Sequence, residues 1–148
     1  MLAVVQRVSS AQCSVEGENV GKIDKGLLVL LAVGKEDSLK DASWMARKLV
    51  NLRIFEDHNQ KMSFSLLDVG GDILVVPKFT LYADCKKGHR PNFSKAASAQ
   101  VARDLFYRVL DFLNEYPVKV QKGVFGARME VSLVNDGPVT VIVSSDKG

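Results

Sequence analysis

Apolar and polar positions alternate in short runs over the first 33 residues, and turn residues separate the runs. This pattern predicts strands at residues 2–8, 11–16, 19–24 and 27–33. The run 27–33 is apolar at every position, which is typical of a strand that is buried on both faces. The first part of the chain therefore predicts a sheet with a buried strand.

The period of the apolar positions then changes to three and four residues, which is typical of amphipathic helices. Ser38 is a suitable N-cap for the first helix, which should end near Arg53. Its apolar face comprises Ala42, Met45, Ala46, Leu49 and Val50. A second helix is predicted within residues 97–116, because Pro117 ends a helix at about the preceding residue. Its apolar face comprises Val101, Leu105, Val109, Phe112 and Leu113.

The remaining segments predict further strands. Residues 65–83 read as two strands on either side of a Gly70-Gly71 turn, and residues 118–146 as about three closing strands. No repeat, low-complexity tract or flexible linker interrupts this order. We therefore expect an α/β fold in one domain over residues 1–148, with two main helices.

Composition and charge narrow the class of protein. With 47% apolar and 25% charged residues and a net charge of +3, nucleic-acid affinity would need a local basic patch. The longest apolar run, Leu27–Val33, is far shorter than the ~20 residues of a membrane helix, and a signal peptide is missing. We expect a cytoplasmic protein that binds no membrane.

Cys13 and Cys85 form no CxxC pair and the chain has two histidines, so we expect reduced thiols and no metal or other cofactor.

The stretch "VVPKFTLYA" is the first candidate for a catalytic segment. Pro77 cannot donate a hydrogen bond to a sheet, so it marks an edge, a bulge or a strand end. Beyond it, the N–H groups of Phe79 and Thr80 would be free to form an oxyanion hole, worth roughly 3–4 kcal/mol per donor. The simpler interpretation is that Phe79 is a core residue and Thr80 an ordinary strand residue.

Two further segments are candidates for a site. Lys86, Lys87, His89 and Arg90 cluster around a glycine, and such a run is either a solvated loop or a contact for nucleic-acid phosphates. Gly137-Pro138 precedes an apolar strand, and it is either an ordinary turn or a cis bond with a purpose. Motifs for dinucleotide binding, P-loops, serine hydrolases and zinc proteases are missing from the sequence.

Together these segments resemble the D-aminoacyl-tRNA deacylase family, homodimeric enzymes that hydrolyse D-amino acids from mischarged tRNA. The resemblance runs from "AVVQRV" to "GPVTVIV", essentially the whole chain. It includes "LVNLRIFED", "DILVV", "FTLYADCKKGHRPNF", "VFGARMEV" and "NDGPVT" in the family's order. The set is specific, although one of these segments alone would be weak.

The resemblance implies a compact α/β domain with layered mixed or antiparallel sheets and two main helices on one side. It also implies a homodimer whose active site lies at the subunit interface. Gly137 and Pro138, joined by a cis peptide bond, would reach into the partner's pocket and reject L side chains by fixed sterics. Arg7 would hold this motif in orientation. Glycine has no side chain to reject, so glycyl-tRNA, including glycine mischarged on tRNA(Ala), is a second expected substrate.

By the same resemblance, the amides of Phe79 and Thr80 polarise the ester carbonyl, and Phe125 and Met129 surround the terminal adenine. Lys86, Lys87 and Arg90 would contact the tRNA backbone, and no DNA partner is expected. Two attacking groups remain open: the Thr80 hydroxyl, or water assisted by the 2′-hydroxyl of the terminal adenosine. The missing acid–base constellation favours the second, because an aminoacyl ester is already activated.

One departure from the family concerns the pocket wall. The family usually has Ser and Gln before Phe-Thr-Leu, whereas this chain has Pro77 and Lys78. A related branch that clears alanine from threonine tRNA carries Pro at the first position but Ala where this chain has Phe79. Two alternatives therefore stand beside the main interpretation: an editing deacylase of shifted specificity, and a tRNA acceptor-end binder without turnover.

Overall fold

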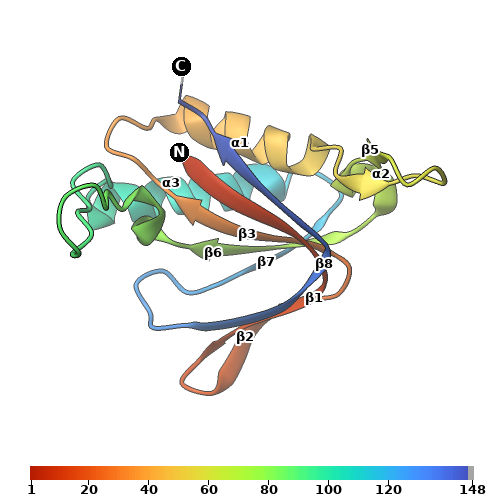
Figure 1. The fold of residues 1–148 in the computed structure, drawn as a ribbon, viewed down its shortest axis with the longest axis horizontal. Coiled ribbons are helices and arrows are strands. Elements are labelled where there is room, and N and C mark those ends of the chain that lie inside the picture. The colour runs from red at the N-terminus through yellow and green to blue at the C-terminus, as the bar shows by residue number, and fades with distance from the viewer. Residues whose placement is uncertain (147–148) are drawn as a thin grey trace.

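The computed structural model describes residues 1–146 as a mixed α/β fold (Figure 1). Its strands are β1 (Leu2–Val15), β2 (Glu18–Ile23), β3 (Gly26–Ala32), β4 (Phe55–Glu56), β5 (Met62–Phe64), β6 (Asp72–Pro77), β7 (Lys119–Lys122) and β8 (Glu130–Ser144). Its helices are α1 (Leu39–Asn51), α2 (Leu66–Val69), α3 (Ala99–Leu113) and the 3-10 helix η1 (Phe79–Tyr82). The predicted α/β class is confirmed.

Six strands form one mixed sheet in the order β2-β1-β3-β6-β7, and β8 pairs with β1. β1 is antiparallel to its neighbours, whereas β3, β6 and β7 run parallel to one another. Along its length β1 changes partner, because residues 2–8 pair with β3 and residues 11–15 pair with β2. The sheet therefore bends strongly around β1 (Figure 1). The expected layered sheets are in fact one bent sheet and the short β4–β5 pair.

Successive residues of the central strands face two separate cores, as the alternation of side chains along a strand requires. Leu27 and Val29 of β3 point toward the helices, whereas Leu28 joins a second core with Cys13 and Val76. All these side chains are at most 1% exposed. The predicted burial of the 27–33 run on both faces is thus confirmed.

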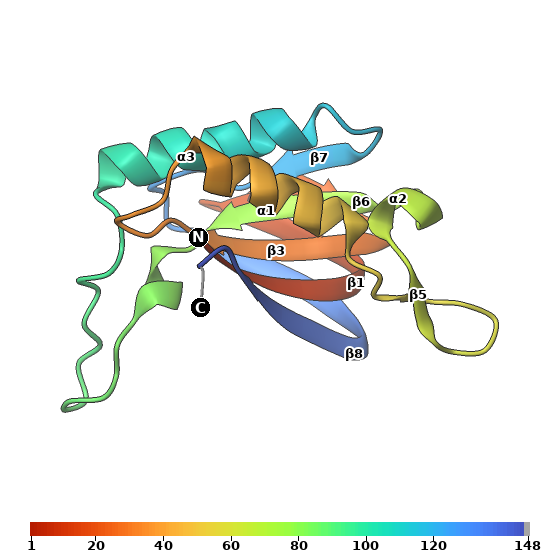
Figure 2. The ribbon, with the colours of Figure 1, turned by 90° about the horizontal axis from the view of Figure 1, so that it is seen from above.

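Both long helices cover the same face of the sheet (Figure 2). In α1, the Asp41 carboxylate accepts a hydrogen bond from the Ser38 N–H at 2.8 Å, and the five predicted apolar residues are the buried ones. In α3, Val109 and Leu113 are buried as predicted, but Val101 is 42% exposed. Apolar side chains occur on more than one side of α3, and the Phe106 ring is buried in the core where Val101 was expected. None of the helices within residues 1–146 has the length and apolarity needed to cross a membrane.

The expected strands differ from the observed elements in four places. The first two expected strands are the single strand β1, whose pairing with β8 is irregular after Gln6. Residues 66–69 are the short helix α2, which a Ser65 cap begins and Gly70 ends with φ 63°. The strand expected to continue through residues 79–82 is η1, and the expected last two strands are the single strand β8. α3 ends at Leu113, before the expected limit.

The packing of α1 makes a prediction about stability. Leu49 is fully buried against the sheet, whereas Leu39 on the same helix is 49% exposed. We expect Leu49→Ala to lower the free energy of unfolding by about 2–5 kcal/mol, because it leaves a cavity. Leu39→Ala should change it by less than about 0.5 kcal/mol. Urea denaturation measures both, and similar losses for the two variants would contradict this packing.

Candidate active site

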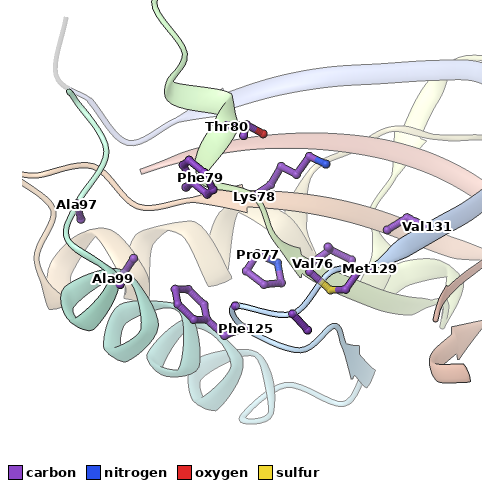
Figure 3. A pocket seen from close by; sticks show the side chains of 13 residues that line it. Val76, Pro77, Lys78, Phe79, Thr80, Ala97, Ala99, Phe125, Met129 and Val131 are labelled. Atoms are coloured by element: carbon purple, nitrogen blue, oxygen red, sulfur yellow. The ribbon is translucent and has the colours of Figure 1, made fainter. Parts of the chain in front are cut away.

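A pocket of about 520 Å³ opens where β6, η1, α3 and the loop after β7 meet (Figure 3). It brings together six of the residues expected at the site. These are Pro77, Lys78, Phe79, Thr80, Phe125 and Met129. Figure 3 shows Phe79 and Thr80 at one end of the pocket and Phe125 at the other, with Pro77 between them. Residues far apart in the sequence therefore share one cavity.

The end of β6 determines the geometry of this pocket. The Lys78 N–H donates to the Leu31 carbonyl at 2.8 Å, and this is the last hydrogen bond between β6 and β3. The chain then leaves the sheet and turns immediately into η1. The first N–H groups of a helix have no partner within it. The N–H groups of Phe79 and Thr80 donate to no protein acceptor within residues 1–146.

Phe79 itself does not belong to the core. Its side chain is 58% exposed and packs edge-on against Phe93, with 5.2 Å between the ring centroids. Thr80 is also exposed and lies in η1, not in a strand. The simpler interpretation of this pair as a core residue and a strand residue is therefore wrong.

The pocket wall opposite Phe79 and Thr80 is held in place by contacts with β6 and α3. The Gly123 N–H donates to the Val75 carbonyl at 2.9 Å, which docks the loop onto β6. Met129 Sδ accepts a hydrogen bond from the Val124 N–H at 3.4 Å. The Phe125 ring lies 6.2 Å from the ring of buried Phe106. Phe125 and Met129 thus form a fixed apolar wall suited to the flat face of a base.

The chemistry available inside the pocket is sparse. Of the side chains that line it, Lys78 alone is ionisable, so the described part of the chain offers no acid–base pair there. Cys13 lies beneath the wall, and burial raises the pKa of its thiol, which keeps it protonated at neutral pH. Within residues 1–146, no three potential metal ligands cluster. Backbone amides are therefore the most evident polar groups for a reacting carbonyl.

Gly137 and Pro138 lie outside this pocket. Their peptide bond is cis, and they sit where β8 leaves its register with β1, between Asn135 and Thr140. The Asn135 side chain donates to the carbonyls of Arg7 and Val139, both at 3.0 Å, and so braces this elbow. We call residues 136–138 the elbow; they are exposed.

Arg7 lies beneath the elbow and is only 4% exposed. Its Nη1 donates to the Ile54 carbonyl at 2.9 Å, and its Nη2 to Glu56 Oε1 at 3.2 Å. Its Nε is 3.1 Å from Asp136 Oδ2, close enough for an ion pair but without hydrogen-bond alignment. A Cβ atom on Gly137 would lie 2.7 Å from Arg7 Nη2. Arg7 therefore lies between the elbow and residues 54–56.

The elbow and the free amides of Phe79 and Thr80 lie beside different positions along β3. Lys78 is hydrogen-bonded to Leu31, whereas Arg7 pairs with Leu27 on the same strand. Four residues of strand correspond to roughly 13 Å. One protomer alone does not bring the elbow and the Phe79–Thr80 segment into one cavity.

The basic residues expected to contact tRNA lie in an exposed loop beyond η1. Asp84 and Asn92 close this loop with two backbone hydrogen bonds of 2.7 and 2.9 Å. Lys86, Lys87 and Arg90 lie on it, exposed, and form no ion pair within residues 1–146. They do not line the pocket.

Part of the pocket lining was not expected from the sequence. The missed residues are Val76, Ala97, Ala99, Ala102, Gly126, Ala127 and Val131. Small side chains at the start of α3 leave room for the cavity, and the Ala-rich stretch before the helix was the available signal. Alanine carries no functional group that would mark it as a site residue in a sequence.

These features define a class of protein: a mixed α/β fold with an apolar pocket whose polar groups are main-chain amides. The model of the family described as D-Tyr-tRNA(Tyr) deacylase matches residues 4–144. The chain belongs to this family. It is 52% identical over 147 residues to a D-aminoacyl-tRNA deacylase of Thermosipho africanus and 54% identical over 148 residues to that of Thermosipho melanesiensis. Each alignment covers 99% of both chains.

Two solved structures support the fold. A protein named "c-Myc DNA Unwinding Element Binding Protein" has a TM-score of 0.93 at 41% identity, over 99% of this chain and 100% of the other. A probable eukaryotic D-amino acid tRNA deacylase has a TM-score of 0.84 at 18% identity, over 96% and 97% of the two chains. The second is evidence for the fold alone.

The elbow makes a prediction about stability. Gly137 has φ +115° and Gly17 has φ +81°, but a Cβ would meet Arg7 at Gly137 and open space at Gly17. We expect Gly137→Ala to lower the free energy of unfolding by at least ~1 kcal/mol more than Gly17→Ala does, because strain and a clash then add. Guanidinium denaturation of both variants measures this difference. Equal losses would show that Arg7 does not constrain the elbow.

Proposed function

We propose that this protein hydrolyses the ester bond of D-aminoacyl-tRNA and releases a free D-amino acid and tRNA. The observation that carries the proposal is the pocket opposite whose apolar wall lie the amides of Phe79 and Thr80, which have no partner among residues 1–146. Such a pair of donors suits the negative oxygen of a tetrahedral intermediate. Membership of the D-Tyr-tRNA(Tyr) deacylase family supports the choice of substrate.

The proposed reaction needs few side chains. Water attacks the ester carbonyl carbon, the amides of Phe79 and Thr80 stabilise the oxyanion, and the bond to the ribose 3′ oxygen breaks. The leaving oxygen takes one proton of the attacking water, the other proton passes to solvent, and the amino acid leaves as a carboxylate. The 2′-hydroxyl of the terminal adenosine assists the water, and Phe125 and Met129 hold the adenine. An activated ester makes such positioning sufficient.

Selection of D substrates is proposed to depend on a second copy of the chain. The elbow at Gly137 and Pro138 lies roughly 13 Å along the sheet from the pocket's amides in one protomer, so it would serve the partner's pocket. There its rigid carbonyls would meet an L side chain, while a D side chain points away. Arg7 would keep the elbow in place through Glu56 and Asp136.

The exposed face of β8 supports a homodimer. This strand pairs with β1 along one edge, and no other strand of residues 1–146 covers its second edge. Val134 and Ile142 on it are 57% and 72% exposed. A long free edge with exposed apolar side chains is a surface that proteins usually cover.

The other expected properties follow from the substrate. Lys86, Lys87 and Arg90 are proposed to contact phosphates of the tRNA, and the protein is proposed to work in the cytoplasm without a cofactor. The 41% identical protein of known structure is named for binding to a DNA element. We propose tRNA and not DNA here, because the aminoacyl ester exists on tRNA.

Purified protein with defined substrates tests the proposal. We expect hydrolysis of D-tyrosyl-tRNA and of glycyl-tRNA on tRNA(Ala), and at least about 100-fold slower hydrolysis of L-tyrosyl-tRNA, which corresponds to roughly 2.7 kcal/mol of discrimination. Hydrolysis of an alanyl ester in preference to the D ester would identify the protein as an editing enzyme of shifted specificity. Salt-sensitive tRNA binding without any hydrolysis would select a binder, and both results would overturn the proposal.

Replacement of Thr80 distinguishes attack by its hydroxyl from attack by water that the 2′-hydroxyl assists. Thr80→Val keeps the shape and the backbone N–H but removes the hydroxyl. If amides and the tRNA act as proposed, we expect kcat to fall by less than about tenfold. A loss of about 10³-fold or more, measured in single turnover, would instead assign the attack to the Thr80 hydroxyl.

A further inference from the structure

A second group of charged and aromatic side chains lies on the surface of α3 and β7. The Tyr107 ring of α3 has two cations close to it: the Arg103 guanidinium carbon at 5.9 Å and Lys122 Nζ at 5.3 Å from the ring centroid. Arg103 and Lys122 are exposed, and neither forms an ion pair within the described residues. Two free cations beside an aromatic ring are typical of contacts to a single nucleic-acid strand.

This group borders a shallow depression of about 270 Å³ between α3 and β7. Tyr107, Asn114, Gln121 and Lys122 contribute polar or aromatic groups to its rim. Asp111 is the one carboxylate of its lining, and it lies 3.8 Å from Arg108, which compensates its charge. Lys122 is therefore the charge of this lining that remains without compensation within the described residues.

The group is continuous with the pocket along α3. Residues four apart lie above one another on a helix, so Ala99, Arg103 and Tyr107 form one line. Ala99 lines the pocket, and Tyr107 lies eight residues further, roughly 12 Å along the helix axis.

The other connection runs through β7 and the loop that follows it. Lys122 ends β7, and the chain continues directly into the wall that holds Phe125 and Met129. Phe106 lies between the two regions, with its ring 5.5 Å from that of Tyr107 and 6.2 Å from that of Phe125. The loop after β7 and the Phe106 ring thus connect this group to the Phe125 end of the pocket.

We propose that Arg103, Tyr107 and Lys122 form a subsite for the one or two nucleotides that precede the terminal adenosine of the RNA 3′ end. The proposal rests on the proposed function, because it takes the terminal adenosine to lie against Phe125. Arg103 and Lys122 neutralise the phosphates, and Tyr107 offers its ring to a base. The loop with Lys86 follows η1, which holds Phe79 and Thr80, and it is proposed to contact a different part of the tRNA.

The experiment compares two substrates and two double variants. The substrates are D-tyrosyl-tRNA and the D-tyrosyl ester of adenosine, which lacks the preceding nucleotides. The test variant is Arg103→Ala/Lys122→Ala. The control is Arg47→Ala/Lys48→Ala on α1, which removes the same charge and a cation that also lies 5.3 Å from an aromatic ring, that of Trp44.

For the test variant we expect KM for D-tyrosyl-tRNA to rise about tenfold or more, with kcat at saturation within twofold. Hydrolysis of the adenosine ester should stay within twofold of wild type. The slope of log K against log salt for a single-stranded RNA that ends in CCA should fall by about 1.4, since each lost phosphate contact contributes about 0.7. The control variant should behave like wild type, and thermal midpoints check that both variants fold.

The outcomes separate this inference from the function on which it rests. If wild type hydrolyses neither ester, the proposed function fails. If wild type is active and the test variant keeps its KM and salt slope for RNA, the subsite is wrong. An equal loss on both substrates would show that the two cations support the pocket structurally, and this also overturns the subsite.

Discussion

The structure depends on the point at which the parallel pairing of β3 and β6 stops. Pro77 ends β6, the Lys78 N–H makes the final bond to Leu31, and the chain then leaves the sheet. Because the turn into η1 is immediate, the next two N–H groups have neither a strand nor a helical partner in the described part of the chain. A proline at a strand end thus exposes two donors beside an apolar cavity, and the remaining walls complete the pocket around them.

A second constraint is the buried charge of Arg7. Its guanidinium group is surrounded by the Ile54 carbonyl and the carboxylates of Glu56 and Asp136, so it joins the β4 region to the elbow. A buried arginine with these partners has few alternative positions. The elbow is therefore fixed although it is exposed, and this suits a proposed role in which its shape, and not its charge, selects the substrate.

Much of the fold could be predicted from the sequence, because local periodicity reports burial. The apolar face of α1 and the two-sided burial of the 27–33 run follow from pattern alone, and both are confirmed. The single strands β1 and β8 could not be predicted, since their length depends on pairing with each other. η1 was missed because "FTLY" has strand-like residues, and only the end of the β3 ladder makes it turn. The roles of the pocket residues came from the resemblance, and the Ala-rich stretch before α3 was the one local sign of its small lining side chains.

A structure of the protein with a non-hydrolysable D-aminoacyl-adenosine amide would show which groups hold the carbonyl oxygen of the substrate. We expect the carbonyl oxygen of the ligand to lie about 3 Å from the backbone nitrogens of both Phe79 and Thr80. We also expect the Gly137-Pro138 elbow of a second protomer to face the ligand Cα. A carbonyl oxygen that points away from both nitrogens, toward solvent or Lys78, would contradict the account.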